Sequence, residues 1–541
     1  MRISALAALF PATILAQGLG SLTGVVTDAS GALVPAARVE ATHTLTGVAA
    51  HASANSAGVF RFASLGIGTY DIRVTAAGFK AWRQNNVLME TDRAVRVDAV
   101  LEIGAAQESV TVTAEAPLLE KESSVVATQI SREMVNKLPY QLTGSIRNPF
   151  AFVQLTPGAQ GQSGAADGIR IAGSRTYANE VYVDGVPMSY NAGQNVAGPG
   201  APSLDTVAEF RVETAITPAE LGRTGGGAVM MASRSGTNRY RANLIALFRN
   251  GVLDARRYNA AQADITRQGE FGGSLGGPVV LPRLFDGHNR TFFFVNYTGF
   301  RRLNDVQGRT GTLATAAMRQ GDFSAAAERI FDPATSGAAQ QRQPFADNRI
   351  PASRISPFAS KFQSFIPLPN GSGLANNHLG TLPSVLDLDS YFAKLDHQFT
   401  PRHRVNGSYR LRFEDRVNGN GFILPISDTI YQGIDIRNLV VAYDFIARPN
   451  VIARLQTGIT RFYAPVVESG DIGLAVPGAF ESGFPGVRFQ GQGLTGFGYG
   501  ADRFTTSTNG NLQSLLSKIG RMAVGDVEGI GIVVRNVAVA G

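Results

Sequence analysis

The strongest constraint on the fold is a two-residue alternation that begins after residue 236. In the first segment, apolar residues occupy every second position and charged or polar residues mostly lie between them; its apolar members are Tyr240, Ala242, Leu244, Ala246 and Phe248. The pattern returns at residues 405–413 and 438–445, and more weakly at 452–462. A period of two indicates a β-strand with one apolar and one polar face. Repeated over many strands, it is typical of a transmembrane β-barrel, although a soluble β-solenoid or sandwich shares the period.

Composition limits the alternatives. The chain has 541 residues, with 61 Gly, 25 Pro and no Cys, so we expect several domains, frequent turns and neither disulfides nor thiolate metal sites. The net charge is +7, but only 17% of residues are charged and the basic ones are scattered, which argues against nucleic acid as a partner. Beyond the N-terminus no apolar run reaches the roughly 18 residues that a transmembrane helix needs. If the chain is integral to a membrane, it must therefore cross as a β-barrel.

The first residues indicate export. Arg2 precedes a short apolar run, and the small residue Ala16 follows that run. This order predicts a secretory signal peptide over residues 1–16; a buried N-terminal strand or helix is the alternative.

Residues 20–103 predict a small β-sandwich, because short strands alternate with turn residues and apolar side chains recur at period two. The segment resembles the carboxypeptidase regulatory-like family through four motifs: Gly24-x-Val26-x-Asp28, Val34-Pro35-x-Ala37, Gly58-x-Phe60-x-Phe62 and Gly68-x-Tyr70. The resemblance implies a fold and not a peptidase, since no His has a Glu three residues on. Asp28 could be imagined as a calcium ligand, but such an Asp is ordinarily a turn former.

Residues 104–235 predict an α+β domain. Ser131 precedes a short apolar-periodic segment that Pro139 ends, which indicates a capped helix. Strands follow at 168–175 and 179–187, with an Asp-Gly turn in the second. A Gly-rich insertion comes next, at 192–202. A helix-to-strand segment and a Gly-rich strand then close the region. In this order the pieces resemble the plug domain of TonB-dependent outer-membrane receptors.

That resemblance implies a TonB box, an extended peptide exposed to the periplasm that adds as a β-strand to the energy-transducing TonB complex. Any alternating Val-Thr strand would match such a box, so its position before the plug carries the assignment. The residues are Glu108, Ser109, Val110, Thr111, Val112, Thr113 and Ala114.

Residues 236–510 are expected to form the front part of the barrel, with a Pro-rich external loop over about 323–382. The runs 271–278, 291–297 and 349–355 resemble the Oar-like branch of these receptors. Gly272-x-Ser274-x-Gly276 also fits the nucleophile elbow of serine hydrolases, but that elbow needs a strand, a turn and a helix, whereas the flanks here are strand-like.

The sequence therefore predicts a mainly β protein: an N-terminal β-sandwich, an α+β plug domain and a partial antiparallel transmembrane β-barrel. The implied function is TonB-dependent transport of an unidentified ligand across the outer membrane, without catalytic residues, metal or cofactor. A surface adhesin, in which the sandwich binds carbohydrate or protein without transport, is the alternative. A 22-stranded barrel would need about 450 residues, and residues 511–541 have no aromatic residue, so we expect a C-terminally truncated or frame-shifted product with an aberrant tail.

Overall fold

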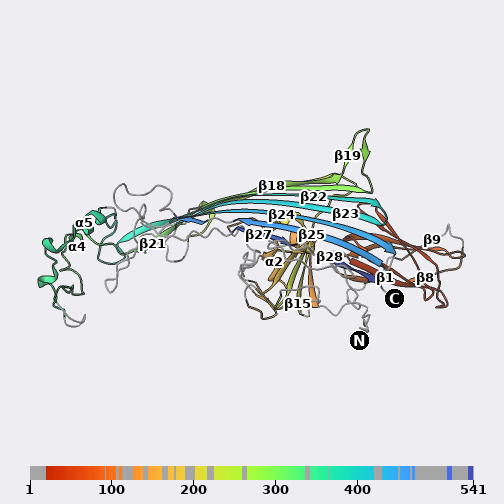
Figure 1. Cartoon of the computed structure of the whole chain (residues 1–541), viewed down its shortest axis with the longest axis horizontal. Coiled ribbons are helices and arrows are strands. Elements are labelled where there is room, and N and C mark those ends of the chain that lie inside the picture. Colours follow the sequence, from red (N-terminus) through yellow and green to blue (C-terminus); the bar gives the residue numbers. More distant parts are fainter. Residues whose placement is uncertain are drawn as a thin grey trace, which may run out of the picture.

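A computed structural model describes most of the chain (Figure 1). The described residues are 20–91, 93–104, 109–112, 126–137, 144–160, 169–175, 178–188, 201–215, 224–256, 258, 263, 265–335, 342–364, 366–419, 429–448, 451–463, 466–468, 508–513 and 534–539. The predicted signal peptide, residues 192–200 of the Gly-rich insertion and most of the predicted aberrant tail lie outside these residues.

The N-terminal domain is a sandwich of two sheets. One contains β1 (Gly20–Asp28), β4 (Val59–Leu65), β7 (Ala94–Arg96) and β8 (Ala99–Leu101). The other has the order β3 (Ala49–Ser53), β2 (Arg38–His43), β5 (Gly68–Thr75), β6 (Ala81–Met89) and β9 (Ser109–Val112). Strands β1 to β8 lie within the predicted residues 20–103.

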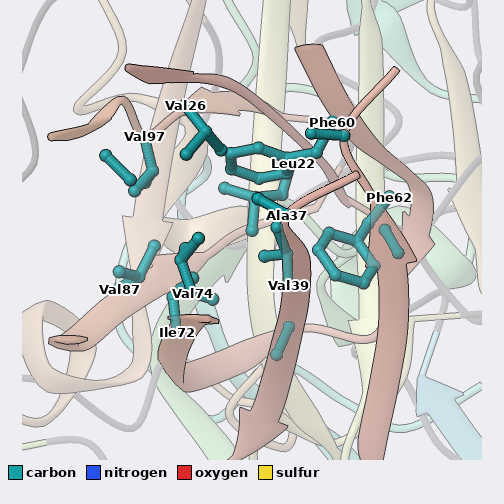
Figure 2. Close-up of a cluster of buried hydrophobic side chains, with 14 of the residues drawn as sticks. Leu22, Val26, Ala37, Val39, Phe60, Phe62, Ile72, Val74, Val87 and Val97 are labelled. Carbon is teal, nitrogen blue, oxygen red and sulfur yellow. The ribbon is translucent and has the colours of Figure 1, made fainter. Parts of the chain in front are cut away.

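Alternation along these strands produces the core of the sandwich. In β4, Phe60 and Phe62 are buried, and in β5 the buried residues are Tyr70, Ile72 and Val74. Figure 2 shows side chains of this cluster from both sheets pointing toward one another. The core is closed around apolar side chains and supports an independently packed domain.

Asp28 acts as a turn former. The Asp28 Oδ1 atom accepts hydrogen bonds from the Ser30 and Ala32 amides, at 2.8 and 2.9 Å, and from the Ser30 hydroxyl. These bonds lower the pKa of Asp28, the Ser30 hydroxyl bond most of all. The carboxylate thus closes a local turn.

The second domain, called the plug from here on, is built on a five-stranded sheet. Its order is β10 (Val126–Ser131), β15 (Val207–Ala215), β16 (Ala228–Ser233), β13 (Glu180–Val183) and β14 (Val186–Pro187). A second pair joins β11 (Ala159–Gln160) to β12 (Arg170–Ile171), and the short helices are α1 (Arg132–Lys137), α2 (Phe150–Val153) and the 3₁₀ turn η2 (Leu204–Thr206). The plug has its own apolar core, which includes Ile130, Phe150, Val153, Phe210 and Met231.

Two local predictions for the plug are confirmed. The Ser131 hydroxyl accepts a hydrogen bond from the Met134 amide at 3.3 Å and so caps α1. Between β13 and β14, Asp184 and Gly185 both have positive φ, 49° and 82°, as the predicted Asp-Gly turn requires.

The third domain is one long antiparallel sheet of ten strands, called the wall from here on. Its path runs β17 (Arg241–Asn250), β18 (Ile265–Pro278), β21 (Thr291–Gly311), β22 (His378–Thr400), β23 (His403–Gly419), β24 (Thr429–Arg448), β25 (Val451–Tyr463) and β27 (Thr508–Gln513). Off this path, β26 (Val466–Glu468) pairs with β24 and β28 (Val534–Val539) pairs with β25, while β19 (Val280–Leu281) and β20 (Phe285–Asp286) form a separate hairpin. The 3₁₀ turn η3 (Gly251–Leu253) follows β17.

Figure 1 shows the wall as an arch with plug elements α2 and β15 beneath it. Among the described strands, β17 pairs only with β18, so the wall is an open part of a barrel. The predicted fold class is confirmed. Two of the strands, β27 and β28, lie partly or wholly in the segment predicted to be aberrant, and both pair with β25.

The external loop begins and ends earlier in the chain than predicted, since β21 already ends at Gly311. Strand β22 begins at His378, before the predicted loop end near residue 382, because its pairing with β21 continues to Gly311. Within the loop lie α4 (Ala316–Arg319), α5 (Pro357–Gln363) and the 3₁₀ turns η5 (Ala346–Asn348) and η6 (Ala352–Arg354). Figure 1 places α4 and α5 at the end of the wall away from the sandwich strands β1 and β8.

The hydrolase motif is not an elbow. Ser274 lies in the middle of β18, which continues without a turn to Pro278. No helix in the described part of the chain has the length and apolar character needed to cross a bilayer.

Candidate functional site

The wall buries polar and charged side chains on an inner face that also holds apolar ones, and it exposes apolar side chains on its outer face. In β23, Ser408, Arg410 and Arg412 are buried, whereas Tyr409 and Phe413 are each 40% exposed. A soluble sheet shows the reverse, and a transmembrane strand with lipid outside and a polar interior shows this arrangement. Other exposed apolar side chains of the wall strands are Leu244, Phe248, Leu275, Val295, Tyr391, Leu395, Leu439, Val441, Leu455 and Ile459.

A buried ion-pair cluster joins the plug to this polar face. The Arg147 amide and Nε atoms donate to the two carboxylate oxygens of Glu270 on β18, both at 2.9 Å. The Arg147 Nη2 atom donates to Asp205 of η2 at 2.5 Å. The side chains of Arg147, Asp205 and Glu270 are 12%, 5% and 0% exposed, so one guanidinium pairs with two carboxylates away from water.

Several other contacts between plug and wall are also polar. Arg302 of β21 donates to the Gly144 carbonyl at 2.7 Å, and Arg412 of β23 donates to the Ala201 carbonyl at 3.1 Å. The Ser203 and Thr298 hydroxyls lie 2.9 Å apart. Ile146 of the plug also packs against Phe300, Leu386 and Leu388 of the wall in a small apolar cluster. The plug therefore meets the wall through hydrogen bonds, ion pairs and this cluster, while its main apolar core is its own.

Asp184 of the β13–β14 turn organises a second contact. It accepts hydrogen bonds from the Ser233 amide at 2.9 Å and from the Ser233 hydroxyl. Lys394 of β22 donates to the Ser233 hydroxyl at 2.9 Å and lies 3.7 Å from Asp184. Gln456 of β25 donates to the Asp184 carbonyl. The predicted Asp-Gly turn is thus the point where the plug contacts strands β22 and β25.

The sandwich contacts both other domains at one end of the wall. The Asn238 side chain, at the start of the wall, donates to the Thr46 carbonyl at 2.6 Å. Arg404 of β23 donates to the Ser64 hydroxyl at 3.0 Å. The sandwich therefore covers this end of the wall directly, through polar contacts.

Glu209 of plug strand β15 faces the sandwich. It accepts hydrogen bonds from the amide and the hydroxyl of Thr91, the amide bond at 2.5 Å. Burial raises the pKa of Glu209, while the bonds from Thr91 oppose the shift.

A cavity of about 620 Å³ lies where sandwich, plug and wall meet. The sandwich contributes Tyr70, whose burial raises its pKa to about 12. The charged residues of the lining are Asp184, Glu209, Arg234, Arg241, Arg290, Lys394, Asp396, Arg404, Asp444 and Arg454. Charged side chains from plug and wall thus line part of this cavity at the sandwich end of the wall, beside apolar ones such as Phe292 and Phe294.

The predicted TonB box is partly described. Ser109–Val112 form β9, the last strand of a sandwich sheet, paired in parallel with β6. Glu108, Thr113 and Ala114 lie outside the described residues. The sequence did not predict the pairing with β6, and the assignment of the box stays a prediction.

Sequence reasoning also missed the ion-pair cluster around Arg147. Arg147 and Glu270 are 123 positions apart, and Arg147 and Asp205 are 58 apart. Neither spacing is a local motif. The only hint was Glu270 itself. It occupies a position of β18 whose side chain faces the interior of the wall, and a buried charge there requires a partner.

Comparison with known proteins agrees with this geometry. Residues 232–521, more than half of the chain, match the family described as outer membrane beta barrel domain. The chain belongs to this outer membrane β-barrel family. Residues 21–102 match the carboxypeptidase regulatory-like domain, which confirms the predicted sandwich family. The protein is accordingly one of the cell outer membrane.

The outer membrane β-barrel protein is also similar to the TonB-dependent transporter Oar of Myxococcus xanthus, with 26% identity over 308 residues. This similarity covers 54% of the chain and 28% of the transporter, so the chain spans well under half the length of that relative. The predicted Oar-like resemblance is confirmed.

Solved structures with a similar fold include the outer membrane transporter YddB from Escherichia coli, with 13% identity and a TM-score of 0.37. That match covers 64% of this chain and 40% of YddB. Another is the alcaligin outer membrane receptor FauA from Bordetella pertussis, with 9% identity and a TM-score of 0.31, covering 64% and 48% of the two chains.

Proposed function

We propose that the protein is a TonB-dependent transporter, which takes a ligand from outside the cell and releases it at the sandwich end of the wall. In this function the TonB complex of the inner membrane pulls on the box, and the plug rearranges to open a path. The transport step needs no covalent chemistry, and the residues that hold the plug are positioning residues.

The carrying observation is the polar contact between plug and wall. A plug with an apolar core of its own, held by ion pairs, hydrogen bonds and one small apolar cluster around Ile146, is separable from the wall without exposing that core to water. Interfaces of this kind resemble those between domains that move. An apolar plug interface would favour a permanent closure instead.

The direction of transport follows from the two ends of the wall. The loop with α4 and α5 lies at one end, and the sandwich and the 620 Å³ cavity lie at the other. Long loops of outer-membrane barrels face outward, so the sandwich faces the periplasm. The similarity to the transporter Oar supports the same orientation and energy source.

Binding of the soluble periplasmic domain of TonB to the purified full chain tests this function. Strand addition uses main-chain hydrogen bonds, so Val110→Pro should reduce binding at least tenfold, while the matched Val110→Ala should not. Equal binding by both variants would contradict the box assignment. No binding by the unchanged chain would favour an adhesin over a transporter.

A further inference from the structure

The cavity where sandwich, plug and wall meet contains a buried arginine with unused hydrogen-bond donors. Arg454 of β25 lines the cavity, and its side chain is 7% exposed. Its Nε and Nη1 atoms have no hydrogen-bond partner among the described residues. Buried polar groups are nearly always hydrogen-bonded, and a buried charge without a close partner is costly. The unused N–H groups of Arg454 therefore point to a ligand.

A second arginine of the lining shares a carboxylate with Arg454. Asp444 of β24 is 3% exposed and lies 3.6 Å from the Arg454 Nε atom and 3.8 Å from the Arg404 Nη2 atom. Both distances are too long for a hydrogen bond, so one carboxylate faces two guanidiniums without satisfying either. The Nε atom of Arg404 also has no hydrogen-bond partner in the described part of the chain. These three side chains together carry one excess positive charge.

The other carboxylates of the lining are engaged with other partners. Asp184 lies 3.7 Å from Lys394, and Asp396 interacts electrostatically with the same lysine. Glu209 accepts two hydrogen bonds from Thr91. Among the described residues, the lining has six basic and four acidic side chains. The cavity is therefore better suited to an anion than to a cation.

The size and the apolar part of the lining are also those of a small-molecule site. The volume of about 620 Å³ lies within the range of roughly 300–1,000 Å³ that is common for ligand pockets. Ile67 and Leu88 of the sandwich and Phe292 of the wall contribute apolar surface. Ligand sites combine such surface with a few charged groups that fix the ligand, and they often lie between domains. Arginine N–H groups match the paired oxygens of carboxylates and phosphates.

We propose that this cavity binds a small organic anion. Its carboxylate or phosphate oxygens accept hydrogen bonds from Arg404 and Arg454, and the rest of the molecule lies against the apolar side chains. The site does not depend on the proposed transport, because it is formed while the plug is in place. Since all three domains contribute to the lining, the bound anion joins sandwich, plug and wall and stabilises this arrangement.

Calorimetric titration of the full chain in non-ionic detergent tests the site with three probes. Benzoate and phenyl phosphate carry the two oxyanions, and benzamide is the neutral analogue of benzoate. Titrations into detergent alone are subtracted. The variant Arg454→Met removes the buried guanidinium, and Arg454→Lys keeps a charge there. The matched control is Arg461→Met, because Arg461 lies on the same strand but is exposed and outside the cavity lining.

We expect benzoate or phenyl phosphate to bind at one site per chain, about tenfold or more tighter than benzamide. Arg454→Met should weaken binding of the anion by about tenfold or more, Arg454→Lys should weaken it less, and Arg461→Met should leave it unchanged. The tighter of the two anions identifies the oxyanion that the site prefers.

The proposal is overturned if neither anion binds more tightly than benzamide, or if Arg454→Met binds the anion as the unchanged chain does. The comparison of the three probes on the unchanged chain decides the question even if Arg454→Met does not fold. None of these titrations involves TonB, so failure of this site and failure of the proposed function are distinguishable.

Discussion

Replacement of Arg147 by methionine would leave the carboxylates of Asp205 and Glu270 buried without the guanidinium that they share. Both carboxylates are at most 5% exposed, and Glu270 receives two of its hydrogen bonds from Arg147. The Arg147 amide remains in the variant, so one bond to Glu270 survives.

The magnitude follows from the burial. Removal of one partner of a buried ion pair costs about 3–5 kcal/mol, because a charge is left uncompensated away from water. Here two carboxylates lose one partner, so the upper part of this range is expected. Since about 1.4 kcal/mol is a factor of ten, opening of the plug from the wall should become more frequent by roughly two to three and a half powers of ten.

Hydrogen exchange measures this opening. Amides of residues 150–156 follow Arg147 in the chain, and several are hydrogen-bonded, including Phe152 to Pro149 and Thr156 to Val153. Their exchange should accelerate in Arg147→Met, whereas exchange in sandwich strand β2 should not change.

A neutralised variant provides the control. Arg147→Met combined with Asp205→Asn and Glu270→Gln has no buried charge at this place, so exchange should return most of the way toward that of the unchanged chain. An increase of less than about tenfold in Arg147→Met would refute the reasoning. So would an equally fast exchange in the triple variant, since the effect would then arise from lost packing and not from charge.

Three further outcomes are expected. Burial lowers the pKa of His43, whose Nδ1 accepts hydrogen bonds from two backbone amides. The unfolded chain therefore binds the proton more readily than the folded chain. The folding stability that is present above about pH 6.5 is lost as the pH falls through the lowered pKa. Thermal unfolding followed by the single tryptophan should therefore shift downward at acid pH, and less so in His43→Gln. Thr91→Val removes one hydrogen bond to the Glu209 carboxyl and should cost about 1.5–3 kcal/mol, seen as faster hydrogen exchange in β15 but not in β2. At Gly272 an added Cβ would lie 2.1 Å from a carbonyl oxygen of β21, so Gly272→Val should abolish heat-modifiable gel migration of the barrel. Gly407→Ala, where the nearest atom is 3.8 Å away, should retain it.

Local chemistry explains why much of the fold could be predicted from the sequence. Ser131 caps a helix within three residues, and Asp184-Gly185 closes a hairpin of two short strands. Alternation in β23 reports one lipid-facing and one polar face, because every second side chain shares an environment.

The remaining features depend on contacts between distant segments. The pairing of β9 with β6 uses backbone groups that every residue has, so Ser109–Val112 carry no sign of their partner. The plug cluster likewise joins Arg147 to Glu270 across 123 positions. The end of the external loop was misjudged because the β21–β22 ladder joins two distant segments and extends to His378.

The length of the wall strands has a consequence for what can reach the protein from outside. Strand β22 has 23 residues, whereas a tilted strand crosses a bilayer with about 9–11. Roughly a dozen residues at about 3.3 Å each, tilted as barrel strands are, extend about 30 Å beyond the lipid. The segment with α4 and α5, which Figure 1 shows at the end of the wall away from the sandwich, is therefore held clear of the headgroups. Antibodies and bacteriophage too large to approach the membrane itself should find their accessible epitopes there.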